Sequence, residues 1–189
     1  MASKEKISEK ALELFRKRGY DNTPMSHVAK ALRLSKGGLY HHFTSKESLL
    51  FHVIYNRMQE DFVPIIEESK RISDPEERIS YFLRNFTRLM AKTDSARVIV
   101  GDARRLKPNH LRKVNAIWRK TFDLLRDAIS EMQAAGNGKE LNQTFMAFGV
   151  FGMVSWIMYW FVYSRNESWE ELADTFIEAF FRGFSKSPE

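Results

Sequence analysis

Residues 35–46, SKGGLYHHFTSK, bring hydroxyl, imidazole and ammonium groups together on a stretch that also contains two consecutive glycines. Glycine in a helix interior costs about 1 kcal/mol relative to alanine, so the pair indicates that this backbone approaches another molecule closely. Hydroxyl, imidazole and ammonium groups bind the phosphates and base edges of DNA. The residues with such groups, or with the thin backbone that a close approach needs, are Ser35, Lys36, Gly37, Tyr40, His41, His42 and Lys46.

A metal site is the competing interpretation of this stretch, because His41 and His42 are followed by a third histidine, His52. Adjacent residues of a helix point to different sides, and no carboxylate stands nearby at ligand spacing. The chain has no cysteine, so it has neither a thiolate site nor a disulfide. We therefore expect no metal ion and no other cofactor.

The elements that must position these groups are two short helices within residues 23–42. Thr23-Pro24 predicts the start of the first, with threonine as the cap, and Ser35 is expected to cap the second. Arg33-Leu34 separates them, and a longer helix that ends at Gly19 precedes them. Two short helices braced by a third are the outline of a helix-turn-helix, whose second helix lies in the major groove of DNA.

The charge distribution agrees with a polyanionic partner for this region. The chain of 189 residues has a net charge of +6, and residues 1–57 alone contain 11 basic and 5 acidic side chains. The first third therefore contains the whole excess, and the remainder is balanced. This asymmetry predicts a small basic module joined to a larger neutral body.

The rest of the chain predicts further helices and no strands. Ser45 is expected to cap a long helix without a full capping box, because Ser48 stands where glutamate or glutamine is usual. Pro64 is expected to kink or end this helix. Later amphipathic helices are expected from Ser73-Asp74-Pro75, over 111–135 and over 169–184. The predicted fold class is all-α.

The uncharged run 141–164 includes FGVFGMVSWIMYWFVY at residues 148–163. Its length suits a membrane span, but Trp156 lies in its middle rather than at an end, and acidic as well as basic residues flank it. A helix that is apolar on all sides is typical of a protein interior. We therefore expect this helix to be buried, and the wall of an apolar ligand pocket is the third interpretation.

The segment SKGGLYHHFTSKESL resembles the signature of TetR-family transcriptional regulators, and Gly19-Tyr20 resembles the pair that ends the family's first helix. Arg33 departs from the family, which usually has glycine there; a positive φ would strain arginine. The resemblance implies a helix-turn-helix DNA-binding domain over 1–46 and an effector-binding and dimerisation domain over 47–189, with 47–64 as a connecting helix. It implies phosphate contacts for Ser35, Tyr40, His42 and Lys46, and base-edge contacts for Lys36, Gly37 and His41.

The resemblance also implies a homodimer through the last two helices and a small effector inside the C-terminal body. GMVSWIMYWFVY and WEELADTFIEAFFRG resemble the C-terminal pattern of regulators that respond to fatty acyl-CoA or related acyl thioesters, although those often have a basic residue where Tyr159 stands. Arg104 and Arg105 are candidate partners for an acidic head group, with solvated surface as the alternative. The residues expected to line the pocket are Phe82, Phe86, Met90, Trp118, Phe122, Phe148, Phe151, Trp156 and Tyr159.

The leading interpretation is a homodimeric repressor that an apolar effector releases from an inverted-repeat operator. An enzyme is the first alternative, but no glycine-rich phosphate loop, zinc motif or serine elbow is present, and His110 is expected in a surface loop. A recombinase would need a spaced acidic metal site, and a membrane-bound sensor a spanning segment. The polar N-terminus, MASKEKISEK, predicts no signal peptide and a cytoplasmic protein.

Overall fold

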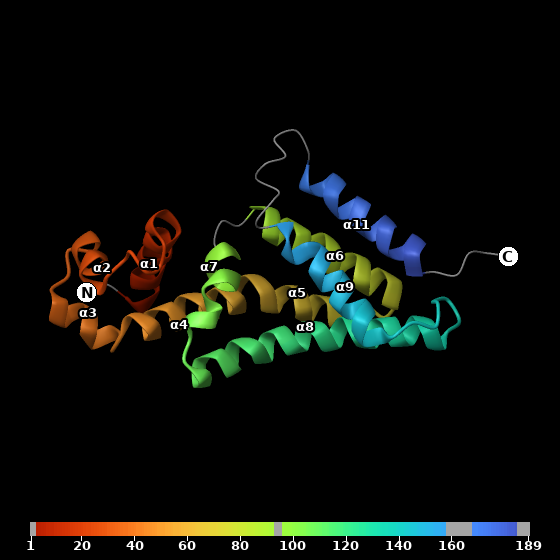
Figure 1. Ribbon diagram of the computed structural model, residues 1–189, viewed down its shortest axis with the longest axis horizontal. Helices are drawn as coiled ribbons and strands as arrows, with labels where there is room; N and C mark the ends of the chain where they lie inside the picture. Colours follow the sequence, from red (N-terminus) through yellow and green to blue (C-terminus); the bar gives the residue numbers. More distant parts are fainter. Residues whose placement is uncertain (1–2, 93–95, 158–167, 185–189) are drawn as a thin grey trace. The chain divides into compact units, whose positions relative to one another are not determined.

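The computed structural model describes residues 3–92, 96–157 and 168–184, and every regular element in these ranges is a helix (Figure 1). The α-helices are α1 (Lys4–Arg18), α2 (Met25–Ala31), α3 (Lys36–His42), α4 (Lys46–Arg57), α5 (Val63–Arg71), α6 (Pro75–Lys92), α7 (Ala96–Gly101), α8 (Pro108–Ala134), α9 (Gln143–Ser155) and α11 (Trp169–Phe184). A π-helix, Met58–Phe62, joins α4 to α5, and a 3-10 helix, Ala103–Arg105, follows α7. The predicted all-α fold is confirmed.

The chain packs into two compact units. The N-terminal unit comprises residues 1–60 and 94–115, and the C-terminal unit comprises residues 61–93 and 116–189. Helix α7 and the start of α8 therefore pack with the helices that precede residue 60. The predicted boundary after residue 46 divides a DNA-binding domain from an effector-binding domain. It is a division by function, which the packing units do not test, and it stays a prediction.

The core of the N-terminal unit lies between α1 and α4, with α2 and α7 against them. Ile7 and Ala11 on α1 and Leu50 and Ile54 on α4 have no exposed surface. Helix α1 ends as predicted at Gly19, which has a φ of 80° and donates its N–H to the carbonyl oxygen of Phe15 at 2.8 Å. The first helix is thus fixed against α4 at the point where the helix-turn-helix begins.

The predicted start of α2 is wrong by one residue. Pro24 is the N-cap, and the buried hydroxyl of Thr23 donates to the carbonyl oxygen of Gly19 at 2.9 Å, with that of Leu14 at 3.4 Å. The last carbonyl groups of a helix lack partners within it. The Thr23 hydroxyl therefore stabilises the end of α1. Because it is bonded there, it does not cap the start of α2.

Helix α2 ends in a Schellman motif, in which the Leu34 N–H donates to the Ala29 carbonyl at 2.9 Å and the Arg33 N–H to the Lys30 carbonyl at 3.1 Å. The motif places its central residue in the left-handed region, and Arg33 has a φ of 56°. Among the described residues other than glycine, Arg33 is the only one with a positive φ. The strain that the sequence indicated at this position is therefore present.

The predicted weak cap of α4 is corrected by the structure, which shows a complete capping box. The Ser48 N–H donates to the Ser45 hydroxyl at 3.0 Å, and the Ser45 N–H donates to the Ser48 hydroxyl at 3.1 Å. A serine side chain is short, but here it reaches the cap nitrogen as a glutamate would. Helix α4 therefore begins at a well-defined residue, Lys46.

Pro64 neither ends the helical path nor lies in an α-helical interior. The backbone widens into the π-helix before it, and Pro64 stands at the start of α5, where the missing N–H costs least. Met58 and Phe62, at the two ends of the π-helix, are almost fully buried. The backbone thus stays helical from Lys46 to Arg71.

The C-terminal unit is built on α6, which packs against α5, α9 and α11 (Figure 1). Its interior is an aromatic cluster in which the Phe62 ring lies edge-on to Phe86 at 4.5 Å and to Trp118 at 4.7 Å. The Phe82 ring stacks on Phe86 at 5.2 Å, and the Phe151 ring lies 5.7 Å from Phe86. These contacts tie the π-helix, α6, α8 and α9 into one core.

Candidate DNA-binding and effector sites

One face of helix α3 is buried, and the opposite face is exposed to solvent. Leu39 is 1% exposed and Phe43 is 5% exposed, so both belong to the core. The Ser35 hydroxyl caps the helix by accepting from the Gly38 N–H at 3.0 Å. On the other face Lys36 and His41 are exposed, as are Gly37 and Tyr40, whereas His42 is half-buried. The candidate recognition residues therefore lie together on one short helix that faces solvent in this chain.

The two glycines of α3 differ in their surroundings. A Cβ on Gly38 would lie 3.2 Å from the Ser35 hydroxyl that caps the helix, so the fold itself favours glycine there. A Cβ on Gly37 would meet no atom of the described chain within 4 Å. Space inside the protein thus explains Gly38 but not Gly37, and Gly37 alone remains a candidate for close approach by a partner.

The third histidine of the sequence lies apart from the first two. The His52 ring packs on Phe43 at 5.2 Å, and its Nε2 lies 3.1 Å from Asn56 Nδ2. Burial, and secondarily the charge of Lys4, lowers the pKa of His52. His41 and His42 are neighbours whose rings meet edge to face at 5.6 Å. Within the described residues no group of three or more His, Cys, Asp or Glu side chains is arranged to hold a metal ion.

Lys46, the first residue of α4, lies in a polar cluster that the sequence did not reveal. Its Nζ lies 4.2 Å from the centre of the Tyr20 ring and donates to the Asp21 carbonyl oxygen at 3.2 Å. The guanidinium of Arg105 lies 5.5 Å from the same ring and pairs with the Asp21 carboxylate at 2.6 Å. Arg105 also donates from Nε to Asp102 at 2.8 Å, so it is paired with two acids, and its candidate role as a head-group partner stays a prediction.

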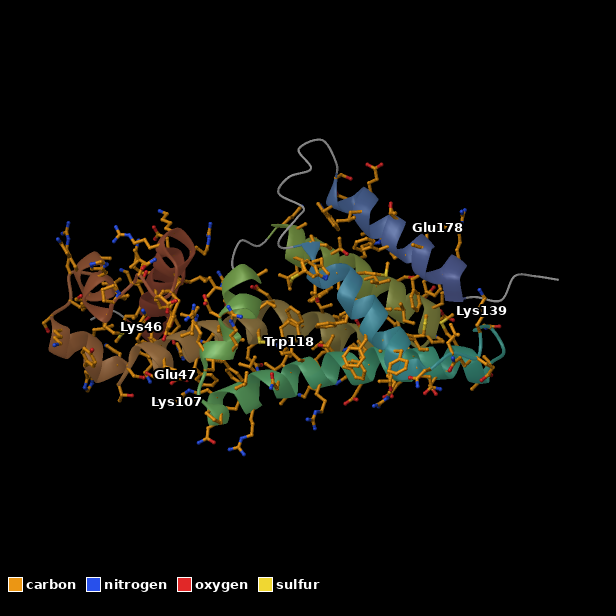
Figure 2. All side chains as sticks on the ribbon, viewed as in Figure 1. Lys46, Glu47, Lys107, Trp118, Lys139 and Glu178 are labelled. Atoms are coloured by element: carbon orange, nitrogen blue, oxygen red, sulfur yellow. The ribbon has the colours of Figure 1, made fainter. Side chains whose placement is uncertain are left out.

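Glu47, beside Lys46, fixes the start of α8 (Figure 2). Its Oε1 accepts from the Lys107 N–H at 2.9 Å and lies 2.8 Å from His110 Nδ1. The His110 ring stacks on Phe51 at 4.0 Å with an angle of 4° between the planes. His110 is therefore half-buried in the first turn of α8 and not in a surface loop as predicted. No periodicity relates Glu47 to His110, so only the tertiary fold reveals this contact.

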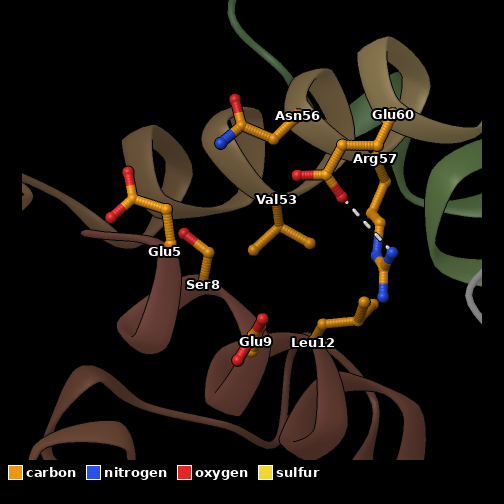
Figure 3. A pocket seen from close by; sticks show the side chains of 8 residues that line it. All are labelled: Glu5, Ser8, Glu9, Leu12, Val53, Asn56, Arg57 and Glu60. Atoms are coloured by element: carbon orange, nitrogen blue, oxygen red, sulfur yellow. Dashed lines mark hydrogen bonds and ion pairs between the residues drawn. The ribbon is translucent and has the colours of Figure 1, made fainter. Parts of the chain in front are cut away.

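A small hollow of about 40 Å³ lies between α1 and α4 (Figure 3). Arg57 and Glu60 form an ion pair of 3.3 Å at its edge. A space of this size holds about one to a few waters, and three of its lining residues are glutamates. It therefore suits neither an apolar effector nor an anion. Its lining residues are Glu5, Ser8, Glu9, Leu12, Val53, Asn56, Arg57 and Glu60.

An aromatic hollow of about 290 Å³ lies between α8 and α9 of the C-terminal unit. Four of the residues expected to line a pocket form its walls, and the exposed Arg119 stands beside them. The Trp118 ring meets Phe151 at 5.3 Å, and the Phe122 ring meets Phe148 at 4.8 Å. The residues that line this aromatic hollow are Trp118, Arg119, Phe122, Phe148 and Phe151.

The other predicted pocket residues lie elsewhere. Phe82, Phe86 and Met90 are at most 4% exposed and belong to the packed core, because aromatic neighbours fill the space beside them. Trp156 is 61% exposed, so its predicted position inside a cavity is wrong for the single chain. Tyr159 lies outside the described residues.

Helix α9 has an exposed apolar face in the single chain, and the expected burial of the whole helix stays a prediction. Phe145 is 71% exposed, Phe148 60% and Trp156 61%. The neighbouring helices of the same chain cover Ala147, Val150 and Val154 completely. The described chain therefore buries one face of α9 and leaves the opposite face exposed. No helix in the described ranges is long and apolar enough to cross a membrane.

Two parts of the chain match known protein families. Residues 7–53 match the family model for bacterial regulatory proteins of the tetR family, and residues 73–184 match that for the tetracyclin repressor-like C-terminal domain. A crystal structure of AibR in complex with isovaleryl coenzyme A and operator DNA is 29% identical, with a TM-score of 0.87, and the alignment covers 94% of this chain and 97% of that chain.

Two curated relatives match shorter stretches of the chain. The transcriptional regulator YuxN of Bacillus subtilis (strain 168) is 37% identical over 76 residues, which are 40% of this chain. IcaR of Staphylococcus aureus (strain Newman), a negative transcriptional regulator of the biofilm operon icaADBC, is 44% identical over 46 residues, which are 24% of this chain. The chain spans about a quarter of the length of these relatives, 26% and 25% respectively.

Proposed function

Because the chain belongs to the tetR family of bacterial regulatory proteins, we propose that it is a cytoplasmic, homodimeric repressor that a small apolar effector releases from an inverted-repeat operator. The exposed face of α3 is the observation that carries the DNA-binding part of this proposal. It presents a lysine, a histidine and a glycine without internal packing on a helix whose opposite face is buried. Such a helix suits the major groove, where side chains read base edges.

The exposed aromatic face of α9 supports the dimer. Large apolar side chains at Phe145, Phe148 and Trp156 would stay in water in a monomer, and contiguous apolar patches on proteins mark interaction sites. A second copy related by a two-fold axis would bring two α3 helices to the same side of DNA. Half-site centres should then lie about one helical turn, roughly 34 Å, or a multiple of it apart. Sedimentation that shows a monomer at micromolar concentration would refute this part.

The DNA contacts are tested by three substitutions. Gly37→Val and Lys36→Ala should weaken operator binding while secondary structure and dimer remain, because a Cβ at Gly37 meets no atom of the described chain within 4 Å and Lys36 is exposed. Lys46→Ala should weaken binding to every DNA sequence and lower the slope of log K against log salt by about 0.9, the contribution of one phosphate contact. Lys120→Ala, an exposed lysine in the C-terminal unit, is the matched control. Wild-type operator affinity in Gly37→Val would disprove the assignment of α3.

The aromatic hollow supports an apolar effector. At about 290 Å³ it lies just below the roughly 300–1,000 Å³ of most ligand pockets, so it suits the acyl part of a thioester better than the whole molecule. Arg119 stands beside this apolar wall, where a guanidinium suits an anionic group of the ligand. AibR was solved with isovaleryl coenzyme A, which supports an acyl thioester as the ligand class for this chain.

Helix α8 supplies a physical route from effector to DNA. Its first residues, with His110, belong to the N-terminal unit, and Trp118 of the aromatic hollow belongs to the C-terminal unit. The two residues are eight positions apart on one continuous helix, about 12 Å along its axis. His110 is bonded to Glu47, the neighbour of Lys46. A displacement of α8 by the ligand would thus act on the start of α4.

The effector is tested by titration with acyl-CoAs and free fatty acids of several chain lengths. Binding should change Trp118 fluorescence and weaken operator binding about 5- to 150-fold, the range of typical allosteric coupling. Trp118→Phe should remove the fluorescence change and keep the release. Tight ligand binding that leaves operator affinity unchanged would reject the coupling, and no binding at any chain length would reject the effector class.

A further inference from the structure

The turn between α1 and α2 joins a candidate phosphate ligand to the 3-10 helix. Lys46 rests on this turn through the Tyr20 ring and the Asp21 carbonyl oxygen. Arg105 contacts the same two residues, Tyr20 and Asp21, although it lies 84 residues after Asp21 in the chain. Its Nη1 donates to Asp21 Oδ1 at 2.8 Å, and its Nη2 lies 2.6 Å from Asp21 Oδ2. Two parallel bonds of this kind fix the orientation of both partners.

Asp21 poses an electrostatic problem for DNA binding. Its carboxylate side chain is 64% exposed and close to Lys46, the cation expected to bind a backbone phosphate. An unpaired carboxylate at this position would repel that phosphate. Asp21 and Arg105 act in opposite directions on the pKa of Lys46, which burial lowers most strongly. Arg105 therefore offsets the charge of Asp21 as Lys46 experiences it.

Arg105 is itself held in place by a second acid. Its Nε donates to Asp102 Oδ1 at 2.8 Å, and the Asp102 side chain is only 20% exposed. The adjacent Arg104, with the same charge, is exposed and lies outside this cluster. Of the two consecutive arginines, only Arg105 is thus oriented by Asp102 towards Asp21.

We propose that Arg105 is a positioning residue for DNA binding, which neutralises Asp21 and braces the Tyr20 turn so that the Lys46 ammonium group is available to a DNA phosphate. This inference rests on the proposed function, because it needs Lys46 to contact DNA. It assigns a role in operator affinity to a residue that follows α7, far in sequence from the helix-turn-helix. Arg105 does not touch DNA in this arrangement; it acts through Asp21 and Lys46.

A charge-rescue experiment on the full-length protein tests the inference. Arg105→Ala should lower operator affinity roughly three- to tenfold, as expected for one uncompensated charge near a phosphate. Asp21→Asn in the Arg105→Ala background should restore affinity to within about twofold of wild type, because the repelling charge is then gone. Arg104→Ala is the control and should change affinity less than twofold. Binding is followed by fluorescence anisotropy at several salt concentrations, with circular dichroism as the check of folding.

The alternative, a direct contact between Arg105 and a phosphate, predicts a different result. Asp21→Asn would then fail to restore Arg105→Ala, and the salt slope would stay lower by about 0.9 in the double variant. That outcome overturns the positioning role, as does wild-type affinity in Arg105→Ala. Lys46→Ala distinguishes a failure of the proposed function from a failure of this inference. If Lys46→Ala binds DNA like wild type, the assigned phosphate contact is wrong. If Lys46→Ala loses affinity but Arg105→Ala does not, only the positioning role of Arg105 is rejected.

Discussion

Arg33→Gly should stabilise the protein, although it removes a long side chain. Arg33 is the central residue of the Schellman motif that ends α2, with a φ of 56°. An L-residue in the left-handed region costs about 1–2 kcal/mol, and glycine removes this cost. Glycine also makes the unfolded chain more disordered, which offsets about 0.5–1 kcal/mol. The net gain should be about 0.5–1 kcal/mol.

The gain is measured by urea unfolding at one fixed protein concentration. For a chain of this size 1 kcal/mol corresponds to roughly 2–4 °C in the melting temperature, so thermal scans should show a rise of about 1–4 °C. Arg33→Ala is the matched control, because alanine removes the charge and keeps the strained backbone. A free energy of unfolding for Arg33→Gly that is no higher than that of Arg33→Ala would refute the reasoning.

The same variants separate the two roles of Arg33. The side chain is exposed beside the recognition helix, so it is also a candidate phosphate ligand. If it binds a phosphate, both Arg33→Gly and Arg33→Ala lower the salt slope of DNA binding by about 0.9. Glycine would then raise stability while it lowers affinity, and the strained arginine would be kept for DNA binding.

Four further outcomes are expected. Thr87→Val should raise the free energy of unfolding by about 1 kcal/mol, seen as a higher urea midpoint, because the buried Thr87 hydroxyl has no hydrogen-bond partner within the described residues. Ser45→Ala should lower it by about 1 kcal/mol in the same assay through loss of the capping box. Burial lowers the folded-state pKa of His52 below its usual 6.5, so the unfolded chain takes up the proton first; stability should fall as the pH drops below about 6.5, and less so in His52→Gln. Trp156→Glu should shift sedimentation towards monomer with unchanged circular dichroism, since it charges the exposed face of α9.

Local signals predicted the helices and their ends well. Gly19 and Ser35 end and begin helices as their residue types indicate, and Arg33 adopts the positive φ that its place in the turn implied. The errors are at Thr23, Ser48 and His110. The Thr23 hydroxyl bonds the end of α1, the Ser48 hydroxyl completes a capping box, and α8 already begins at Pro108. Which backbone group a short hydroxyl reaches is set by the folded geometry, and the identity of the residue does not specify it.

Contacts between distant segments could not be predicted in this way. From the sequence Arg105 was a candidate head-group partner or a solvated arginine, because its partner Asp21 lies 84 residues away. Trp156 looked internal because the run around it is uncharged, yet it is exposed in the single chain. Composition states how much apolar surface must be covered, but the covering partner is set by the tertiary and quaternary arrangement.

The division into two units also separates the intrinsic chromophores of the protein. All four tryptophans occur after residue 115, so the N-terminal unit contains tyrosines but no tryptophan. Tryptophan emission therefore reports on the C-terminal unit alone, whereas circular dichroism reports on all helices. Because the chain has no cysteine, one cysteine introduced at the exposed Tyr40 would carry a unique dye on the DNA-binding part. The two signals together would show whether both units unfold in a single transition, and energy transfer from tryptophan to the dye would follow their separation when ligand binds.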